Sequence, residues 1–196
     1  LARSTKIVPY LDIPLQHISD TVLRAMRRGT NSATIRKRMN ELRERLPYLA
    51  IRTSFIVGYP GETSEDFEAL IEFLREAKFE RLGGFAYSHE EGTASYDLPG
   101  QLPEDLKQNR LERLMFTQRE ISRVNNEALI GREMDVLVER QSPDSELVWI
   151  GRTASQAPEI DGVTYLGNID GLSAGKIVRA RITQTNDYDL VGEIIH

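Results

Sequence analysis

Two hydrophobic periods alternate along the first 130 residues of the chain. Continuous apolar runs, which are typical of strands buried on both faces, occupy 6–15, 49–62 and 81–88. Between and after them, apolar residues recur every three or four positions, as in amphipathic helices. The pattern predicts helices over 19–28, 33–46, 64–78 and 104–130. The apolar stripe of the helix over 64–78 consists of Phe67, Leu70, Ile71 and Leu74. The predicted buried side of the last helix consists of Leu111, Leu114, Ile121, Val124 and Ala128.

Capping residues support these limits. Ser19 stands where the first helix would need an N-cap, and Gly29 is expected to end it. Thr63 or Ser64 would cap the third helix. Continuous strands that alternate with helices predict a parallel sheet covered by helices. Three such units are too few for a closed barrel, so we expect one side of a larger (β/α) barrel.

After Gly131 the pattern changes to short apolar segments separated by turn residues. Five strands are predicted, over 132–140, 146–153, 162–168, 176–184 and 188–195. This spacing favours a small five-stranded antiparallel β-barrel of the oligonucleotide/oligosaccharide-binding kind. The predicted fold class is therefore α/β, with a partial barrel over residues 1–130 and a small β-barrel over residues 131–196.

The net charge lies entirely in the second predicted domain. Residues 1–130 hold 19 basic and 19 acidic residues, whereas residues 131–196 hold 6 and 11, so 6 − 11 = −5. An acidic surface attracts basic partners and repels phosphate backbones. Solubility alone is the plainer interpretation of the same charge.

Composition narrows the class of protein. The sequence has no cysteine, which excludes disulfides and thiolate metal ligands within it. No apolar run approaches the roughly 20 residues of a membrane span, and no signal-peptide pattern opens the chain. We therefore expect a cytoplasmic protein without a membrane partner. Because the chain opens on Leu1 rather than Met, we expect it to be a fragment of a longer polypeptide.

Function in (β/α) barrels gathers at the carboxyl ends of the strands. Polar or flexible residues at those ends, or close to them, are Gln16, Arg28, Ser54, Gly58 and Tyr87. Amide, hydroxyl, aromatic and guanidinium groups at one barrel end would suit a zwitterionic ligand with sugar hydroxyls, a planar base and a carboxylate. Taken singly, Arg28 is better explained as a surface charge, and Tyr87 is equally well explained as a plug of the barrel mouth.

No self-contained catalytic device is present. The sequence has no serine nucleophile elbow, no phosphate-binding P-loop and no histidine spacing typical of a metal site. Its three histidines, His17, His89 and His196, are scattered. A lone histidine more often has a structural role than a catalytic one.

Three longer motifs identify a family. The segments "YLDIPLQHISDTVLRAMRRGT", "IRTSFIVGYPGETSEDF" and "RLGGFAYSHEEGTAS" resemble the radical S-adenosylmethionine methylthiotransferases. "DIPLQH" and "RLGGFAYSHEEGT" resemble the RimO-type branch, which modifies an aspartate of small-subunit ribosomal protein S-12. The MiaB-like branch, which modifies tRNA, usually has "PVQSGS" and "SPRPGT" instead. Residues 131–196 resemble the TRAM domain that ends both branches.

The resemblance implies an enzyme with an N-terminal domain, a radical SAM partial barrel and a TRAM barrel. Its cofactors would be S-adenosylmethionine and two 4Fe-4S clusters, whose cysteines, including a CxxxCxxC loop, are expected upstream. The clusters and S-adenosylmethionine would provide radical insertion of a methylthio group at the aspartate β-carbon. By this resemblance the chain would be inactive alone, with no catalytic residue and no metal ligand identified in it.

Site residues follow from the resemblance position by position. Gln16 would contact the ribose of S-adenosylmethionine, and Arg28 would bind the methionine carboxylate. Ser54 would also lie near the ribose, where relatives often have Asp. Gly58 and the turn to Glu62 would line the cofactor edge, and Phe85 to Tyr87 would support the adenine.

On the substrate side the resemblance indicates His17, Tyr59 and Glu62. His17 stands where the tRNA branch has Ser, so we interpret it as a marker of the branch. The acidic TRAM domain would bind the basic S-12 protein, which makes tRNA the less favoured partner. The alternatives are a MiaB-like tRNA methylthiotransferase and a non-catalytic binding module.

Overall fold

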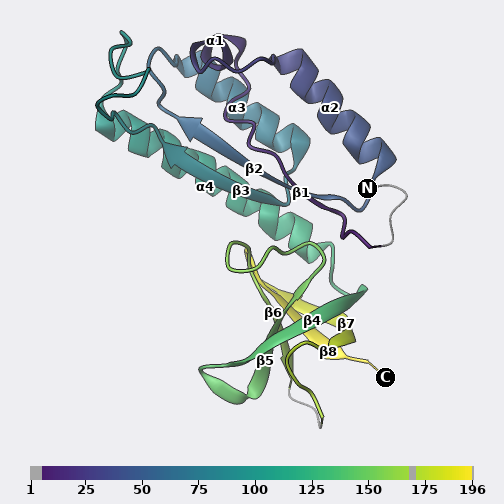
Figure 1. Ribbon diagram of the computed structural model, residues 1–196. Coiled ribbons are helices and arrows are strands. Elements are labelled where there is room, and N and C mark those ends of the chain that lie inside the picture. Colours follow the sequence, from purple (N-terminus) through teal and green to yellow (C-terminus); the bar gives the residue numbers. More distant parts are fainter. Residues whose placement is uncertain (1–5, 168–170, 196) are drawn as a thin grey trace. The chain divides into compact units, whose positions relative to one another are not determined.

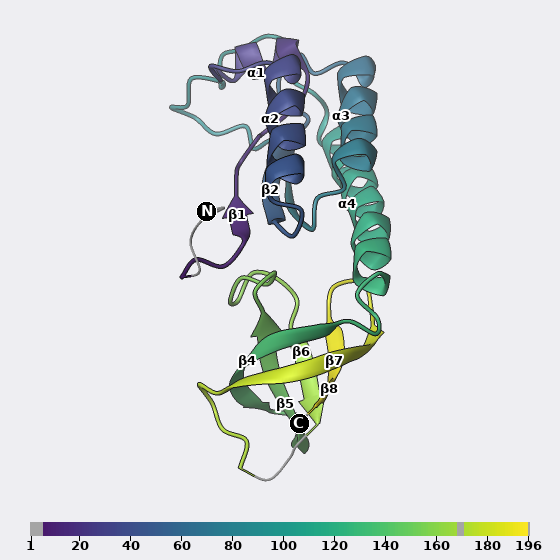
Figure 2. The ribbon, with the colours of Figure 1, turned by 90° about the vertical axis from the view of Figure 1, so that its right-hand side faces the viewer.

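A computed structural model describes residues 6–167 and 171–195. Within them the chain divides into two compact units (Figures 1 and 2). One unit is Leu11–Gln118, and the other holds the described residues from Arg119 onward with those up to Tyr10. Among the helices of these ranges, none has the length and apolar content that crossing a membrane requires. The predicted domain limit at residue 130 stays a prediction.

The first unit is built on a three-stranded sheet in the order β1-β2-β3. Its strands are β1 (Tyr10–Asp12), β2 (Ala50–Val57) and β3 (Arg81–Ala86). β2 and β3 pair in parallel, and Gln16 forms a further parallel bridge with Phe55. The accompanying helices are α1 (Asp20–Ala25), α2 (Ser32–Arg45), α3 (Ser64–Ala77) and the part of α4 (Glu104–Glu127) up to Gln118. The predicted strand–helix alternation is confirmed.

The first strand is much shorter than the apolar run of 6–15 predicted. Pro9 and Pro14 flank β1, and proline cannot donate to a strand ladder. Beyond β1 the chain still follows β2, because the Ile13 amide donates to the Arg52 carbonyl at 2.9 Å. The extended path therefore continues to Gln16 without a regular strand.

Helix α1 also ends earlier than expected. It stops at Ala25, and Arg27 adopts a left-handed conformation with φ of 55°. The Arg28 amide then donates to the Leu23 carbonyl at 2.8 Å, which closes the helix. Gly29 is therefore not the terminator, whereas the predicted N-cap Ser19 is confirmed by its bond from the Val22 amide.

The core of this unit lies between the sheet and α3. The predicted apolar stripe of α3 is confirmed, since Phe67, Leu70, Ile71 and Leu74 are all buried. Phe73 and Phe79 pack edge-to-face around Phe55, at 6.4 and 6.0 Å between ring centroids. Such aromatic clusters bury large apolar areas and stabilise the sheet–helix contact.

The buried side of α4 differs from the expectation. Val124 was expected inside but is 60% exposed, and Ala128 is exposed as well. Leu114 is buried as predicted, but the other buried positions of α4 are polar or charged: Lys107, Arg110, Gln118, Ser122 and Asn126. Gln118 donates to the Phe79 carbonyl at 2.9 Å, and Asn126 donates to the Asn186 carbonyl at 3.2 Å. Hydrophobic periodicity cannot predict this buried face, because its side chains are polar and are satisfied by backbone carbonyls.

The second unit contains a closed five-stranded barrel in the order β4-β5-β6-β8-β7. Its strands are β4 (Glu133–Ser142), β5 (Ser145–Thr153), β6 (Thr164–Gly167), β7 (Ile177–Thr185) and β8 (Leu190–Ile194). Val136, Val138, Leu166 and Ala180 form its core. The five predicted strands are confirmed.

One pairing departs from the expected antiparallel barrel. Four of the five contacts between strands are antiparallel, but β6 and β8 run in parallel. An odd number of strands cannot alternate in direction all the way round a closed barrel. One parallel pair is therefore unavoidable.

Candidate functional site

A cavity of about 550 Å³ opens at the carboxyl ends of β2 and β3, beside the extended segment after β1. The strand ends contribute Pro14, Gln16, Ser54, Ile56, Tyr59, Phe85, Ala86 and Tyr87. Ser88, Glu90, Thr93 and Ser95 complete the lining. Six of the residues predicted from the sequence therefore meet at one cavity: Gln16, Ser54, Tyr59, Phe85, Ala86 and Tyr87.

Gln16 reaches this cavity through an unusual backbone conformation. Its φ is 73°, in the left-handed region that favours glycine. The strand β2 holds it there from both sides: its amide donates to the Ser54 carbonyl at 2.8 Å, and its carbonyl accepts from the Ile56 amide at 2.9 Å. A strained non-glycine residue that is held so firmly is typical of a functional site.

Tyr59 and Tyr87 form the aromatic side of the cavity. Their rings meet edge-to-face at 5.2 Å, and the Lys107 ammonium lies 5.5 Å from the centroid of the Tyr87 ring. The Tyr59 hydroxyl donates to the Ala25 carbonyl at 3.3 Å. The Tyr87 hydroxyl is buried and has no hydrogen-bond partner among the described residues. Buried hydroxyls are normally paired, so this one fits a polar ligand group.

Gly58 lies behind the cavity rather than on its wall. Its φ is 74°, and a Cβ added there would lie 2.5 Å from Cγ of Lys107. Its amide donates to Oε2 of Glu62 at 2.8 Å. Glycine is therefore required for the turn to pass close to Lys107, while the amide is already used inside the protein.

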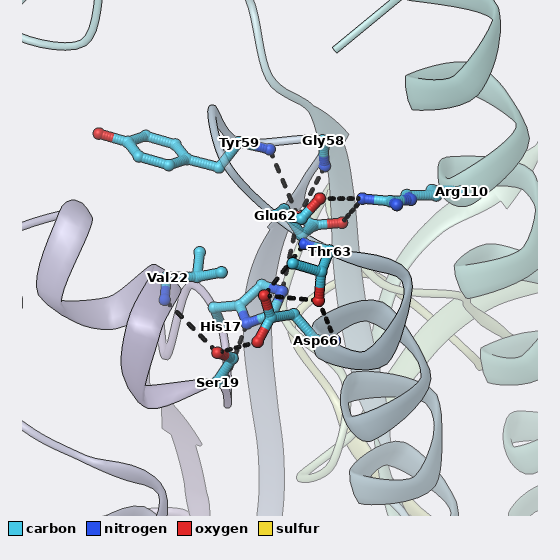
Figure 3. A network of polar contacts seen from close by, with 9 residues as sticks. All are labelled: His17, Ser19, Val22, Gly58, Tyr59, Glu62, Thr63, Asp66 and Arg110. Atoms are coloured by element: carbon cyan, nitrogen blue, oxygen red, sulfur yellow. Dashed lines mark hydrogen bonds and ion pairs between the residues drawn. The ribbon is translucent and has the colours of Figure 1, made fainter. Parts of the chain in front are cut away.

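Glu62 is the centre of a buried polar network (Figure 3). Arg110 donates to Oε1 of Glu62 at 2.6 Å and to its carbonyl at 3.1 Å. Nε2 of His17 lies 3.5 Å from Oε2, and the side chains of His17 and Glu62 are fully buried. The structure thus places these two predicted substrate-side residues in the protein interior, where the Arg110 guanidinium compensates the buried carboxylate.

The other nitrogen of His17 connects the network to two helix starts. The Ser19 amide donates to Nδ1 of His17 at 3.0 Å, so a neutral imidazole carries its proton on Nε2, toward Glu62. The Ser19 hydroxyl donates to Asp66 at 2.5 Å, and Asp66 also forms a capping box with Thr63. Burial by itself would raise the pKa of Asp66, but the hydrogen bonds from Ser19 and Thr63 outweigh it and lower the pKa below 3.8.

Arg28 is not among the residues that line the cavity. Its guanidinium donates to the Pro14 carbonyl at 2.7 Å. It lines an apolar cavity of about 580 Å³ beside α2 and a polar one of about 360 Å³ at the start of α2. Pro14 borders both the cavity beside α2 and the cavity that contains Gln16.

The charged residues Glu90, Lys107 and Arg110 of this region were among those not predicted from the sequence. Lys107 and Arg110 are three positions apart on α4 and are both buried. Charged residues at helical spacing are normally solvent-exposed, so no local signal separates this pair from a surface face.

Comparison with known proteins relates this arrangement to two protein families. Residues 1–74 match the family model described as the radical SAM superfamily, and residues 130–195 match the TRAM domain. Relatives named "Ribosomal protein uS12 methylthiotransferase RimO" match essentially the whole chain. Those of Anaeromyxobacter sp. (strain Fw109-5), Sorangium cellulosum and Myxococcus xanthus are 49%, 51% and 48% identical over 100% of it. The chain is therefore similar to RimO proteins in both its radical SAM segment and its TRAM segment.

The chain covers only part of these RimO proteins, namely 41%, 40% and 41% of their lengths. Among solved structures, coproporphyrinogen III oxidase (HemN) from Escherichia coli, described as a radical SAM enzyme, aligns with a TM-score of 0.49 and 15% identity. The alignment covers 74% of this chain and 41% of HemN. The predicted resemblance to the RimO-type branch is confirmed by the relatives.

No metal-binding cluster occurs among the residues that the structure describes. The sequence lacks cysteine, and the described residues contain no group of three or more His, Asp or Glu side chains placed to hold a metal ion. Iron–sulfur clusters are held by cysteine thiolates. Cluster ligands for a RimO protein therefore cannot be cysteines of these 196 residues.

Proposed function

We propose that this chain is part of a radical S-adenosylmethionine methylthiotransferase that modifies the β-carbon of an aspartate in ribosomal protein uS12. The observation that carries the proposal is the identity of about one half to RimO proteins along the whole chain, through both the barrel segment and the TRAM domain. Because uS12 is a component of the ribosome, the proposed site of action is the cytoplasm.

The cavity at the strand ends fits S-adenosylmethionine. Its volume of about 550 Å³ lies within the range of ligand pockets, and the buried hydroxyl of Tyr87 offers an unused polar group. In the proposed arrangement Gln16 and Ser54 hold the ribose, and Phe85 to Tyr87 support the adenine. When bound beside a reduced 4Fe-4S cluster, S-adenosylmethionine supplies the radical chemistry that activates an unreactive carbon.

Arg28 would bind the methionine carboxylate beyond Pro14. Apart from the bond to Pro14, no side-chain hydrogen bond of Arg28 is formed within the described residues, so the remaining guanidinium donors are available. Guanidinium groups bind carboxylates through paired hydrogen bonds. Gly58, His17 and Glu62 would support the site from behind, while Tyr59 lines it.

Two 4Fe-4S clusters would complete the enzyme. Their ligands would come from parts of the protein other than this chain, as the absence of cysteine requires. The residues present here would therefore orient S-adenosylmethionine and exclude water from it, while the clusters provide electrons and sulfur.

The TRAM barrel would bind uS12 through its acidic charge. Three of its carboxylates, on Glu133, Asp135 and Glu139, are already paired with arginines. Asp144, in the β4–β5 turn, and Glu146, at the start of β5, are exposed and form no side-chain ion pair among the described residues. Unpaired carboxylates in and beside this turn would attract a basic ribosomal protein.

The deciding experiment uses the complete protein with reconstituted clusters. It is incubated with S-adenosylmethionine, a reductant and a sulfide source, together with either uS12 or tRNA. Mass spectrometry should find a methylthio group on one aspartate of uS12 and none on tRNA. Modification of tRNA alone would establish the MiaB-like alternative. Binding without modification of either would favour a non-catalytic module.

A further inference from the structure

One wall of the cavity comes from the β3–α4 loop, residues 88–101, rather than from the sheet. Ser88, Glu90, Thr93 and Ser95 face the cavity from this loop. Gln16 and Ser54 contribute to the same cavity from the strand ends. The loop therefore forms a second wall, and its side chains are not needed to build the sheet.

Side-chain contacts give this loop a defined shape. The His89 ring stacks on Tyr96 at 4.3 Å between centroids, and Nε2 of His89 lies 2.9 Å from the Tyr96 carbonyl. The Gln101 amide donates to three loop carbonyls, those of Ser95, Tyr96 and Leu98, at 3.1 to 3.2 Å. Contacts at several points along the loop lock its side chains in place, as a binding site requires.

Glu90 carries the only formal charge among the residues that line the cavity. Its carbonyl accepts from the amide and the hydroxyl of Thr93, at 3.3 and 2.7 Å, which fixes the backbone. Its carboxylate has no hydrogen bond or ion pair with any described residue. The buried Tyr87 hydroxyl on the same cavity is also unpartnered among them. The Glu90 carboxylate, which is exposed, is therefore available to a ligand.

We infer that Glu90 is a specificity-determining residue that binds a lysine or arginine side chain of the polypeptide substrate, next to the residue being modified. This inference rests on the proposed function. A single carboxylate on a cavity wall favours a cation and repels nucleic-acid phosphates, so it discriminates in favour of a basic polypeptide. Thr93 and Ser95 would supply hydroxyl contacts to the same segment of substrate.

The test compares Glu90→Gln with Glu91→Gln in the complete reconstituted enzyme. Each substitution removes one exposed negative charge from the same loop, but only Glu90 lines the cavity. We expect Glu90→Gln to raise the KM for uS12 roughly 3- to 10-fold, the scale of a partly exposed ion pair, with little change in kcat. The KM of Glu91→Gln should stay within about twofold of the wild-type value.

Three outcomes would overturn the inference. Equal changes in both variants would indicate general electrostatics. A weaker affinity of Glu90→Gln for S-adenosylmethionine, measured by calorimetry, would show that Glu90 faces the cofactor. An unchanged KM for uS12 would exclude any role in substrate binding.

A double-mutant cycle identifies the partner. Each lysine and arginine of uS12 near the modified aspartate is changed singly to Gln and assayed with wild-type enzyme and with Glu90→Gln. One of these changes should lose its effect in the Glu90→Gln enzyme. Strict additivity for all of them would contradict a direct contact. If the wild-type enzyme leaves uS12 unmodified, the proposed function itself fails, and this is seen before any variant is compared.

Discussion

Nε2 of His17 and Oε2 of Glu62 lie 3.5 Å apart, and both side chains are fully buried. The same carboxylate oxygen accepts from the Gly58 amide at 2.8 Å, while Oε1 accepts from Arg110. One buried carboxylate therefore joins the end of the β1 segment, the turn after β2 and helix α4. The contact with Glu62 holds His17, the residue after Gln16, in place. Glu62 and His17 therefore help to position the cavity, although neither lines it.

Replacing Glu62 should destabilise the protein strongly. Glu62→Gln leaves the Arg110 guanidinium buried without its counter-charge, and breaking such a pair costs about 3–5 kcal/mol. Glu68→Gln is the matched control, because Glu68 of α3 pairs with Arg113 of α4 at 2.8 Å on the exposed surface. Urea unfolding should show a loss of roughly 1 kcal/mol or less for the control. Equal losses in the two variants would contradict the role of burial.

Asp66 should make stability depend on pH in the acid range. Its pKa is lowered in the folded protein, because hydrogen bonds from Ser19 and Thr63 outweigh its partial burial. A lowered pKa contributes stability above the unfolded value of 3.8, which is lost as the pH falls through the folded pKa. Asp66→Asn should therefore have a lower Tm than wild type at neutral pH and lose less on acidification. Glu72→Gln, at an exposed position of the same helix, should show the wild-type dependence of Tm on pH. If the Tm of Asp66→Asn instead changed with pH in parallel with the wild type, this linkage would be refuted.

Alanine substitutions at Gly58 and Gly92 distinguish the stability cost of backbone strain from the cost of steric overlap. Both have positive φ, of 74° and 81°, but a Cβ on Gly92 would meet no atom within 4 Å. Gly92→Ala should cost about 1 kcal/mol for the left-handed conformation. Gly58→Ala should cost about 1–3 kcal/mol more, since the new Cβ overlaps Lys107. Thermal unfolding of both variants checks the difference, and equal Tm values would show that Lys107 moves aside freely.

We expect the left-handed conformation of Gln16 to lower the stability of the fold, and its side-chain amide to strengthen ligand binding. Gln16→Gly relieves the left-handed strain and should stabilise the fold by about 1 kcal/mol relative to Gln16→Ala, which keeps a Cβ. Both variants lose the side-chain amide, so both should bind S-adenosylmethionine more weakly in the complete protein. Arg27→Gly is the matched control, because Arg27 has a similar backbone conformation, with φ of 55°, but lies outside the cavity lining. If calorimetry found full affinity in Gln16→Gly, the amide would have no part in binding.

Charge placement on the barrel should matter more than net charge for binding uS12. Asp144→Asn with Glu146→Gln removes two unpaired negative charges in and beside the β4–β5 turn. Glu133→Gln with Asp135→Asn changes the net charge equally, but at residues paired with Arg181 and Arg179. The turn variant should associate with uS12 several-fold more slowly at low salt than the paired-residue variant. Identical association rates would mean that only the total charge counts.

Local patterns determined most of the architecture. Strand–helix alternation, the apolar stripe of α3, its N-cap and the five barrel strands all follow from burial that repeats along short segments. The residues at the strand ends were predictable for the same reason, because parallel strands present their carboxyl ends at one edge. Gln16, Ser54, Tyr59 and Tyr87 do line one cavity. Their roles toward a cofactor stay predictions.

Tertiary structure decided what depends on partners distant in sequence. Glu62 and Arg110 are 48 positions apart, and neither signals its burial in the hydrophobic pattern. The buried side of α4 is polar because backbone carbonyls of other segments satisfy Gln118 and Asn126. Arg28 was predicted to join the residues at the strand ends. Its guanidinium instead donates to the Pro14 carbonyl and lines other cavities. Periodicity records which face of an element is apolar, whereas the pairing of buried polar groups is fixed only when the elements pack together.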